Sequence, residues 1–563
     1  MAQMEIAAGQ PLKNAAKMLR LIEGAKEQGA EILIFPHMAI AGLMSGGMLK
    51  RPAFIRDCKS YTSEVIKASK GITIIFDNEN GELMIAQNGK LVEREETIDE
   101  AVKLRIGGRD IIFHATFDDG EFEADFDLTL ERLDFNVIFA SVPYYQDNKT
   151  RSKIFSKQAR MSGCPIIYVN NVGVQNKGKT IYTFEGASTV YNSKGEIVIQ
   201  AERFNETLTL VELSEIERLQ PIKGYDELEI AGIYQALHSG VGKFLEQIGM
   251  SKIVIGISGG IDSAVAAALY TKILGAENVL LVNMPSVFNS ATTRGLSERL
   301  AKNLGCNYMV VPIQESVDRT IKQLESTPLI YLTNGTERKL TLSPLAKENL
   351  QARDRSGRVL ATLAAVFGGG FTCNANKAET TVGYATMYGD SAGVVCALAD
   401  LWKRQVYELA CYMNDEIYLR EVIPQGIIDI VPSAELSTAQ NVDEGKGDPL
   451  KYDYHDYLLR AFVECGALPE DILAWYIEGS LETRIGCAAG LIKKYFTSAE
   501  EFIADVERWW RQFTGIAVAK RIQAPPVMAL SRNSFGADFE EAQNGVYYTR
   551  NYEELKKKLL KHK

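Results

Sequence analysis

The segment with the clearest chemical potential is the loop Ser258-Gly259-Gly260-Ile261-Asp262-Ser263. An apolar run at residues 252–257 precedes it, and a helical pattern begins near Ser263, so the loop is expected to join a buried strand to a helix. Paired glycines let the backbone approach an anion closely, and the unpaired N–H groups of a helix N-terminus attract it. The two serine hydroxyls add donors. The loop is therefore predicted to hold the phosphates of a nucleotide.

The carboxylate within this loop predicts a metal ion. Asp262 would repel phosphate unless a cation lay between them, so we expect Mg²⁺ to bridge Asp262 and the phosphates. Alternatively, the segment is an ordinary strand-to-helix turn in which Ser263 caps the helix. The Walker A pattern is absent, because no Lys-Ser or Lys-Thr pair follows the glycines.

The elements around the loop predict a doubly wound parallel sheet. Strands are expected at 252–257, 278–285 and 308–313, and helices at 263–274 and 293–304. A polar stretch from Glu217 to Glu229 contains Pro221 and Gly224, so we expect a linker there and then a helix to about residue 248. The second domain is accordingly predicted at residues 229–563.

The first part of the chain predicts a separate α/β domain at residues 1–220. Helices are expected at 11–28 and about 150–163, strands at 32–35, 136–144 and 165–171, and a hairpin at 183–200 with its turn at 192–195. A chain of 563 residues also exceeds what one hydrophobic core usually serves. Two domains follow from both observations.

Composition limits the partners and the compartment. No run of eighteen apolar residues is present, so a membrane span is not expected, and the formal charge of −10 argues against nucleic-acid binding. The eight cysteines form no Cys-x-x-Cys pair, which favours reduced thiols over disulfides or zinc. The first ten residues show no signal sequence, so a cytoplasmic location is expected.

The phosphate loop resembles the PP-loop of ATP pyrophosphatases, which cleave ATP to AMP and pyrophosphate while activating a carboxylate or carbonyl group. Six further segments, in this order, resemble the signature blocks of NAD(+) synthetases: 348–355, 374–379, 382–390, 398–403, 432–436 and 520–526. The resemblance implies a PP-loop domain that adenylates the nicotinate carboxylate of deamido-NAD(+) and lets ammonia displace AMP. It also implies ATP and Mg²⁺ as cofactors and a homo-oligomer.

The same resemblance assigns roles to single residues. Contacts to ATP and its phosphates would come from Ser258, Gly259, Gly260, Asp262, Ser263, Asn374, Lys403 and Ser433. Asp262 and Glu379 would hold Mg²⁺, and Lys403 would offset the charge on the leaving pyrophosphate. Arg353 and Lys520 would bind the dinucleotide, Lys520 from a basic loop that could form a lid.

Each of these roles has a simpler alternative. Glu379 could be an exposed glutamate at a helix start, placed after an apparent strand, and Arg353, following an apparent helix start, could form a surface ion pair. Lys403 and Lys520 could be solvated lysines. Ser433 could be the N-cap of a helix from residue 434 onward.

The chain also departs from the family pattern. Asn374-Ala375 stands where Thr-Gly is common, Met387 stands where shorter members have a lysine that contacts deamido-NAD(+), and the spacing from Arg353 to Asn374 is one residue longer. A related ligase for a different carboxylate therefore stays open as an alternative. A catalytically silent partner subunit is a second.

Residues 1–220 resemble the nitrilase-like amidase domain of glutamine-dependent NAD(+) synthetases, an α/β sandwich. The resemblance lies in residues 9–14, 34–36, 39–42, 168–173 and 184–188. It implies a Cys nucleophile with a Glu base and a Lys, which release ammonia from glutamine.

None of these three residues is at its expected position. His37 replaces the Glu, the run 93–96 lies where the Lys would be, and His114, Ala115 and Thr116, followed by residues 117–119, lie where the Cys would be. We therefore expect ammonia rather than glutamine as the nitrogen source. Cys58 and Cys164 are predicted to be core thiols, and a repurposed site around His37 and His114 is the alternative.

Overall fold

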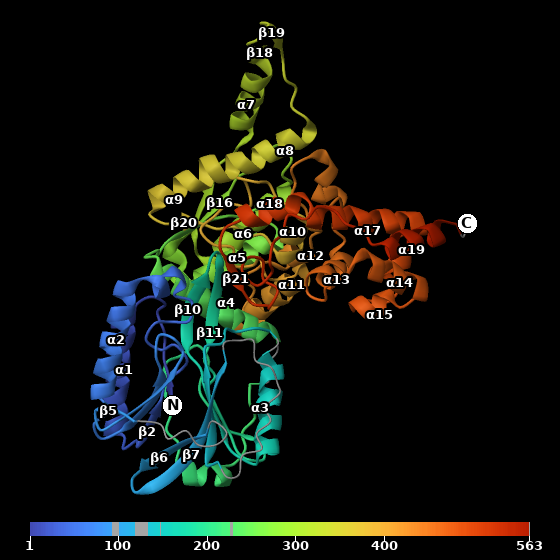
Figure 1. The fold of residues 1–563 in the computed structure, drawn as a ribbon. Helices are drawn as coiled ribbons and strands as arrows, with labels where there is room; N and C mark the ends of the chain where they lie inside the picture. Colours follow the sequence, from blue (N-terminus) through green and yellow to red (C-terminus); the bar gives the residue numbers. More distant parts are fainter. Residues whose placement is uncertain (93–100, 119–132, 147, 226–228, 562–563) are drawn as a thin grey trace. The chain divides into compact units, whose positions relative to one another are not determined.

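The computed structural model of the chain describes residues 1–92, 101–118, 133–146, 148–225 and 229–561 (Figure 1). Two compact units are present: Met1–Phe244 with Ala529–Ser531, and Leu245–Met528 with Arg532–Lys563. The division falls within helix α4 (Glu229–Gln247). The domain limits expected from sequence place all of α4 in the second domain, and residues 226–228 of the predicted linker lie outside the described residues.

The first unit contains two β-sheets. One comprises, in spatial order, β2 (Ile32–Ile34), β3 (Thr73–Asp77), β4 (Leu83–Gln87) and β5 (Lys90–Leu91). The other comprises β13 (Ile197–Gln200), β12 (Thr189–Tyr191), β9 (Ile166–Val169), β8 (Phe135–Ala140), β7 (Arg109–Asp118) and β6 (Val102–Ile106). β2 is parallel to β3, and β7, β8 and β9 are mutually parallel.

Alternation along the strands accounts for the layers of this unit. Ile34 and Ile75 join the core between the two sheets, whereas Leu33 and Ile74 point to the outer face of the first sheet. The outer faces are covered by α1 (Pro11–Glu27) and α2 (Pro52–Lys67) on the first sheet and by α3 (Asn148–Ser162) on the second (Figure 1). This helix–sheet–sheet–helix order confirms the predicted sandwich.

The predicted hairpin is shorter than expected. β12 and β13 pair across the turn at Asn192–Glu196, but residues 183–185 belong to another hairpin. That hairpin consists of β10 (Val172–Lys177) and β11 (Thr180–Glu185). A short pair, β1 (Ala2–Gln3) with β14 (Thr207–Leu208), completes the described strands of the unit. Local alternation alone could not separate two consecutive hairpins.

The second unit is built on a parallel sheet. Its spatial order is β17 (Asn307–Val310), β16 (Val279–Asn283), β15 (Ile253–Gly256) and β20 (Gly370–Phe371). All neighbouring strands are parallel. The chain steps outward from β15 to β17 and later returns to the other side of β15. The strand order therefore reverses beside β15, which is where open α/β sheets bind ligands.

Helices cover both faces of this sheet, as predicted. Val254 and Val282 pack with Leu360 on one face, near α9 (Ala361–Phe367), whereas Ile255 and Leu281 are buried on the other, near α5 (Ile261–Leu274). α6 (Ala291–Leu304) joins β16 to β17.

The remaining elements of the second unit are mostly helical. They are α7 (Gln314–Ser326), β18 (Leu329–Tyr331), β19 (Thr336–Arg338), α8 (Pro344–Arg353), α10 (Lys377–Val382), α11 (Lys403–Tyr412), α12 (Gln425–Asp429), α13 (Tyr452–Val463), α14 (Pro469–Glu478), α15 (Leu481–Ile485), α16 (Leu491–Tyr495), α17 (Ala499–Thr514), α18 (Ile516–Gln523), β21 (Val527–Ala529) and α19 (Arg550–Lys561). α13, α14, α17 and α19 share one aromatic-rich hydrophobic core.

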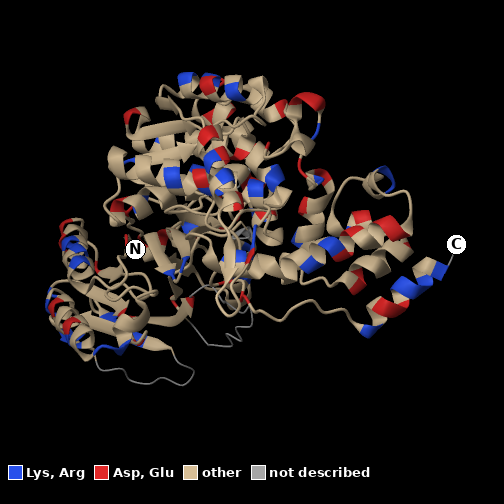
Figure 2. Ribbon diagram, turned by 90° about the horizontal axis from the view of Figure 1, so that it is seen from above, with Lys and Arg blue, Asp and Glu red and all other residues tan. Residues whose placement is uncertain are grey.

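Acidic and basic residues are interspersed along the outer helices (Figure 2). Among the described residues, no helix combines the length and the apolar character needed to cross a membrane.

Candidate active site

The loop Ser258–Ser263 lies at the reversal point of the sheet, between β15 and α5. Gly259 has φ +90°, and a Cβ there would lie 2.4 Å from the Thr293 carbonyl oxygen, so only glycine fits. The Ser258 Oγ accepts from the Gly260 N–H at 3.2 Å, and the Ser263 Oγ donates to the Gly260 carbonyl at 3.0 Å. These bonds hold the loop around the first turn of α5, where an anion would bind.

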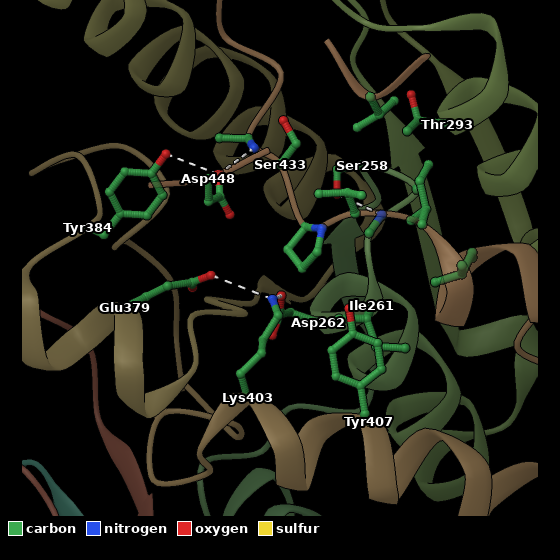
Figure 3. Close-up of a pocket in the computed structure, with 18 of the residues that line it drawn as sticks. Ser258, Ile261, Asp262, Thr293, Glu379, Tyr384, Lys403, Tyr407, Ser433 and Asp448 are labelled. Carbon is green, nitrogen blue, oxygen red and sulfur yellow. Dashed lines mark hydrogen bonds and ion pairs between the residues drawn. The ribbon is translucent and has the colours of Figure 1, made fainter. Parts of the chain in front are cut away.

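The helix begins two residues earlier than expected. α5 starts at Ile261 with Gly260 as its N-cap, so Ser263 lies inside the first turn and does not cap the helix. Asp262 is therefore the second residue of the helix, and its side chain projects into the same cavity as the loop (Figure 3). An ordinary Ser263-capped turn is wrong for this segment.

Three residues from three helices meet at this cavity (Figure 3). The Lys403 Nζ, from the first residue of α11, forms an ion pair with the Asp262 Oδ2 and lies 3.8 Å from the Glu379 Oε1. The Asn376 amide donates to the Asp262 Oδ1 at 3.1 Å. Side chains separated by more than 100 residues in sequence thus form one charged cluster.

Glu379 lies in a helix and not on a loop after a strand. It is the third residue of α10, and its backbone N–H donates to the side chain of Asn376, the N-cap, at 3.1 Å. Its side chain is only 17% exposed and faces Lys403, so it is a helix-start glutamate directed into the cavity. Lys403 is 3% exposed, which excludes the solvated-lysine alternative.

Asp448 is a further carboxylate of the cavity, which the sequence did not single out. It accepts from the Tyr384 hydroxyl at 3.0 Å and from the Ala434 N–H at 3.0 Å. Its segment carries no family block and no regular periodicity, so only its place in the fold brings it to Glu379.

The charge balance of the cluster favours a bound cation. Burial, with the charge of Asp262, raises the pKa of Glu379 to about 8, and burial raises the pKa of Asp448. Burial opposes the charge of Lys403, but Asp262 and Glu379 outweigh it and hold its pKa above the usual value. The carboxylates that line this cavity, those of Asp262, Glu379, Asp390 and Asp448, therefore outnumber the ammonium group of Lys403, an excess that a divalent cation would offset.

Mg²⁺ fits the carboxylate oxygens of this cavity if phosphate oxygens of a bound nucleotide supply further ligands. Within the described part of the chain, no three His, Cys, Asp or Glu residues are arranged to hold a metal by themselves. Asp262 and Glu379 supply two hard oxygen donors, and Mg²⁺ commonly takes the rest from phosphates and water.

A second cavity adjoins the first and shares the side chains of Ser258, Asp262, Glu379, Tyr384 and Asp390 with it. Their volumes are 160 and 250 Å³. The second cavity also contains Met284, Arg355, Leu360, Asn374 and Leu436, which combine apolar surface with a guanidinium group and an amide. This mixture suits a nucleoside or a pyridine ring beside charged groups.

Asn374 and Ser433 lie in the cavities, as the resemblance implies. Asn374 lines the second cavity and its Oδ1 accepts from the Thr372 hydroxyl at 2.8 Å. Ser433 lines the first cavity and donates to the Gln440 carbonyl at 2.7 Å. No helix begins at residue 434, so the capping alternative for Ser433 is wrong. Contact of either residue with ATP stays a prediction.

Arg353 contributes to neither cavity. It is the last residue of α8 and not near a helix start, and its Nε donates to the Met387 carbonyl at 3.1 Å. Arg355, two residues on, lines the second cavity and donates to the Met284 carbonyl and the Asn289 side chain, both at 3.1 Å. Residues two apart on a helix face different directions, and burial lowers the pKa of Arg355 only to about 10. Arg355 is thus the cation at this cavity that the sequence missed.

Lys520 lies on a helix, so its placement in a basic loop is wrong. Its Nζ donates to the Gly383 and Ala385 carbonyls, each at 2.7 Å, from within α18. It thereby holds the segment whose Tyr384 lines both cavities. The helix ends at Gln523, two residues before Pro525, because the residue that precedes a proline is disfavoured in a helix.

Asp456 fixes the start of α11. Its Oδ2 accepts from the Arg404 N–H at 2.9 Å, and its side chain is buried. Burial raises the pKa of Asp456 to about 7. An ionised carboxylate at the helix N-terminus orients the backbone that carries Lys403.

Asp456 should make stability depend on pH. Its pKa in the folded state exceeds its ordinary value of 3.8, so the folded protein binds more protons between these values, and its stability falls as pH rises toward 7. Asp456→Asn keeps an acceptor and removes this titration. We expect the unfolding free energy of the variant, relative to the parent, to rise by up to about 3 kcal/mol from pH 5 to pH 8. Denaturant unfolding at both pH values measures it.

The matched control is Asp453→Asn on the same helix, where the side chain is 45% exposed beside Lys494. It should leave the pH dependence unchanged. An equal offset of Asp456→Asn from the parent at pH 5 and pH 8 would refute the assignment.

The former amidase positions lie on two sides of a sheet. His37 follows β2, and its Nδ1 lies 2.6 Å from Oδ2 of the buried Asp77. Its ring packs 5.2 Å from that of Phe117, whose side chain belongs to the core between the sheets. His114 and Thr116 alternate with Phe117 on β7 and so point to the opposite face. His37 and His114 do not form one site.

Two details of this region differ from expectation. β7 continues to Asp118, so His114, Ala115 and Thr116 lie within the strand and not after its end. His37 does have a carboxylate partner, Asp77. The run 93–96 and Asp119, assigned to the former Lys and Cys positions, lie outside the described residues.

The cysteines of the first unit are core thiols, as predicted. Cys58, on α2, is buried in the core between the helices and the first sheet, and Cys164 is 3% exposed. Burial raises the pKa of Cys58 to about 11 and that of Cys164 to about 12. Both therefore stay protonated at neutral pH and are poor nucleophiles.

Comparison with known proteins relates the chain to NAD(+) synthetases. Residues 233–485 match the family model of NAD synthase, and this segment includes the phosphate loop, Glu379 and Lys403. The chain is 29% identical to a glutamine-dependent NAD(+) synthetase of Xylella fastidiosa, with 96% of each chain covered. The chain is similar to NAD(+) synthetases along nearly its whole length. Such enzymes are ligases that form a carbon–nitrogen bond.

Solved structures share the fold of the NAD(+) synthetase family along the whole chain. A glutamine-dependent NAD(+) synthetase of Acinetobacter baumannii, in complex with ADP, has a TM-score of 0.66 at 24% identity and covers 97% of this chain and 98% of its own. A glutamine-dependent NAD(+) synthetase of Cytophaga hutchinsonii has a TM-score of 0.73 at 15% identity, with coverage of 99% and 98%. The two-unit architecture is therefore that of the family.

Proposed function

We propose that the chain converts deamido-NAD(+) to NAD(+), with ATP as the activating co-substrate and free ammonia as the nitrogen donor. The observation that carries this proposal is the cluster of Asp262, Glu379 and Lys403 beside the Ser258–Ser263 loop. The match to the NAD synthase family model and the similarity to NAD(+) synthetases support the choice of substrate.

The chemistry has two steps. An oxygen of the nicotinate carboxylate attacks the α-phosphorus of ATP, and the bond to pyrophosphate breaks with its electron pair on pyrophosphate. Ammonia then adds to the acyl carbon of the adenylate, AMP leaves with the electrons of the acyl–oxygen bond, and the nitrogen loses a proton. No protein nucleophile is required.

The protein acts by positioning and by electrostatics. N–H groups at the start of α5 and the serines of the loop would bind the departing pyrophosphate. Mg²⁺, held by Asp262 and Glu379, would neutralise phosphate charge when bound. Lys403, largely buried, supplies a fixed positive charge at the same cavity.

Free ammonia is favoured by the first unit. The position of the usual base holds His37, paired with Asp77, and the two cysteines of the unit are buried thiols. Neither arrangement supplies the activated Cys that glutamine hydrolysis in this family needs.

The decisive experiment is to measure pyrophosphate release with deamido-NAD(+) and with a panel of other carboxylic acids, each with ATP, Mg²⁺ and ammonium. Release and NAD(+) formation with deamido-NAD(+) alone support the proposal. Release with another acid would indicate a related ligase, and no release with any acid would indicate a silent subunit.

Lys403→Ala tests the role of the buried charge. If Lys403 acts on the charge of the leaving pyrophosphate, kcat should fall by about 10²–10³-fold and the KM for ATP should change much less. Steady-state kinetics measures both, with melting temperature as a check on folding. Arg404→Ala is the control, because Arg404 pairs with Glu408 on the outside of α11. A rise in the KM for ATP at constant kcat would show that Lys403 contributes to the binding of ATP and not specifically to the transition state.

A further inference from the structure

A second buried lysine lies beside the charged cluster without entering either cavity. Lys377 is the first residue of α10, two positions before Glu379, and its side chain is 0% exposed. Its Nζ lies 2.8 Å from the Asp400 Oδ1 and 3.0 Å from the Glu464 Oε1, and 5.3 Å from the centre of the Trp402 ring. Burial opposes its charge, but the two carboxylates hold its pKa above the usual value.

These contacts join the two helices that carry Glu379 and Lys403. Trp402 is the N-cap of α11, directly before Lys403, and its indole N–H donates to the same Glu464 oxygen at 2.8 Å. The Lys377 backbone N–H also donates to the Leu401 carbonyl at 2.8 Å. One buried group therefore sets the spacing between the first turns of α10 and α11.

Stability alone does not account for this arrangement. Removing Lys377 and Asp400 from water carries a large desolvation penalty for each charge, and well-packed apolar residues are often as stable as a buried pair. What an ion pair adds is a defined geometry, because a misplaced partner leaves a charge unpaired in the interior. The pair lies between the first turns of α10 and α11, so a shift of either helix would move Glu379 or Lys403 away from Asp262.

We propose that Lys377 is a positioning residue, which acts through α10 and α11 to hold Glu379 and Lys403 around Asp262. The inference rests on the proposed function, since it assigns these three residues to binding Mg²⁺ and nucleotide. Lys377 touches no substrate. Its loss should change how well the cluster binds a metal–nucleotide complex and should leave the fold in place.

The test uses the full chain with the double substitution Lys377→Met and Asp400→Asn. Lys377→Met alone would leave Asp400 buried and unpaired and could prevent folding, whereas the double variant removes both charges and keeps the volumes similar. We expect a melting temperature close to that of the parent. The Kd for Mn²⁺ with a non-hydrolysable ATP analogue, measured by electron paramagnetic resonance, should rise about tenfold, and kcat should fall at least tenfold with a smaller change in the KM for deamido-NAD(+).

Asp505→Asn is the matched control. Asp505 pairs with His455 at 2.9 Å in the helical core of the same unit, and it lines neither cavity. This variant should lower the melting temperature and leave Mn²⁺ binding unchanged.

The outcomes separate the two proposals. A folded double variant that binds Mn²⁺ and turns over like the parent overturns the positioning role. Weaker Mn²⁺ binding in the double variant, with no pyrophosphate release by the parent from deamido-NAD(+), upholds the positioning role and refutes the proposed substrate.

Discussion

Asp262→Asn is expected to reduce Mg²⁺-dependent pyrophosphate release by at least about 10³-fold without unfolding the protein. Asparagine has nearly the same shape as aspartate and can still accept the hydrogen bond from Asn376, so the loop and α5 should keep their structure. The substitution removes the carboxylate charge that pairs with Lys403 and that would bind Mg²⁺. Pyrophosphate release at several Mg²⁺ concentrations, together with the melting temperature, measures the effect.

Asp318→Asn on the exposed side of α7 is the control, and it should match the parent in rate and stability. Full activity of the folded Asp262→Asn variant would refute the assignment of Asp262 as a Mg²⁺ ligand. A loss of activity that high Mg²⁺ fully restores would show a role in metal affinity alone.

The second large effect concerns the nitrogen donor. With glutamine freed of ammonia, NAD(+) formation is expected at less than about 1% of the rate with ammonium salts, because no activated cysteine is in place. NH₃ is the nucleophile and ammonium dominates at neutral pH, so the KM for total ammonia should fall roughly tenfold per pH unit between pH 7 and 8.5. The assay follows NAD(+) and glutamate together.

His37→Glu is the informative control for this prediction. It restores the family residue at one of three positions, and residues that act as a unit contribute little singly, so glutamine should still fail. Coupled release of one glutamate per NAD(+) by the parent would show an active first unit and a wrong assignment of its catalytic positions. The relatives named as glutamine-dependent make this the sharpest test of the chain.

The sequence alone predicted the segments whose signals are local. The strand, the glycine pair and the helix that follows predicted the phosphate loop, and period-two and helical patterns predicted both α/β units. Ordered blocks predicted the family. The loop and the element patterns depend on neighbours within a few residues, because backbone conformation and side-chain periodicity are set at that range, whereas the ordered blocks are a resemblance to known proteins.

These patterns did not predict which face of a helix a residue lies on or where a helix ends. The resemblance assigns the substrate contact to Arg353, but the turn of α8 and its continuation direct Arg355, two residues further on, into the cavity. Lys520 was assigned to a loop, and α18 extends through it to within two residues of Pro525. Such errors of one turn follow from the small energy differences between helix and loop at element ends.

Only the tertiary structure decided which distant residues meet. Asp448 reaches the cluster, Asp456 caps α11 and Lys377 joins α10 to α11 because the sheet order and helix packing bring these segments together. It also separated His37 from His114, which pattern alone had allowed to form a site. The contacts of Asp448 with Tyr384, Asp456 with Arg404 and Lys377 with Glu464 join residues 64, 52 and 87 positions apart. At that range no periodicity in the chain reports distance, because the free energy of packing the whole core determines which residues meet.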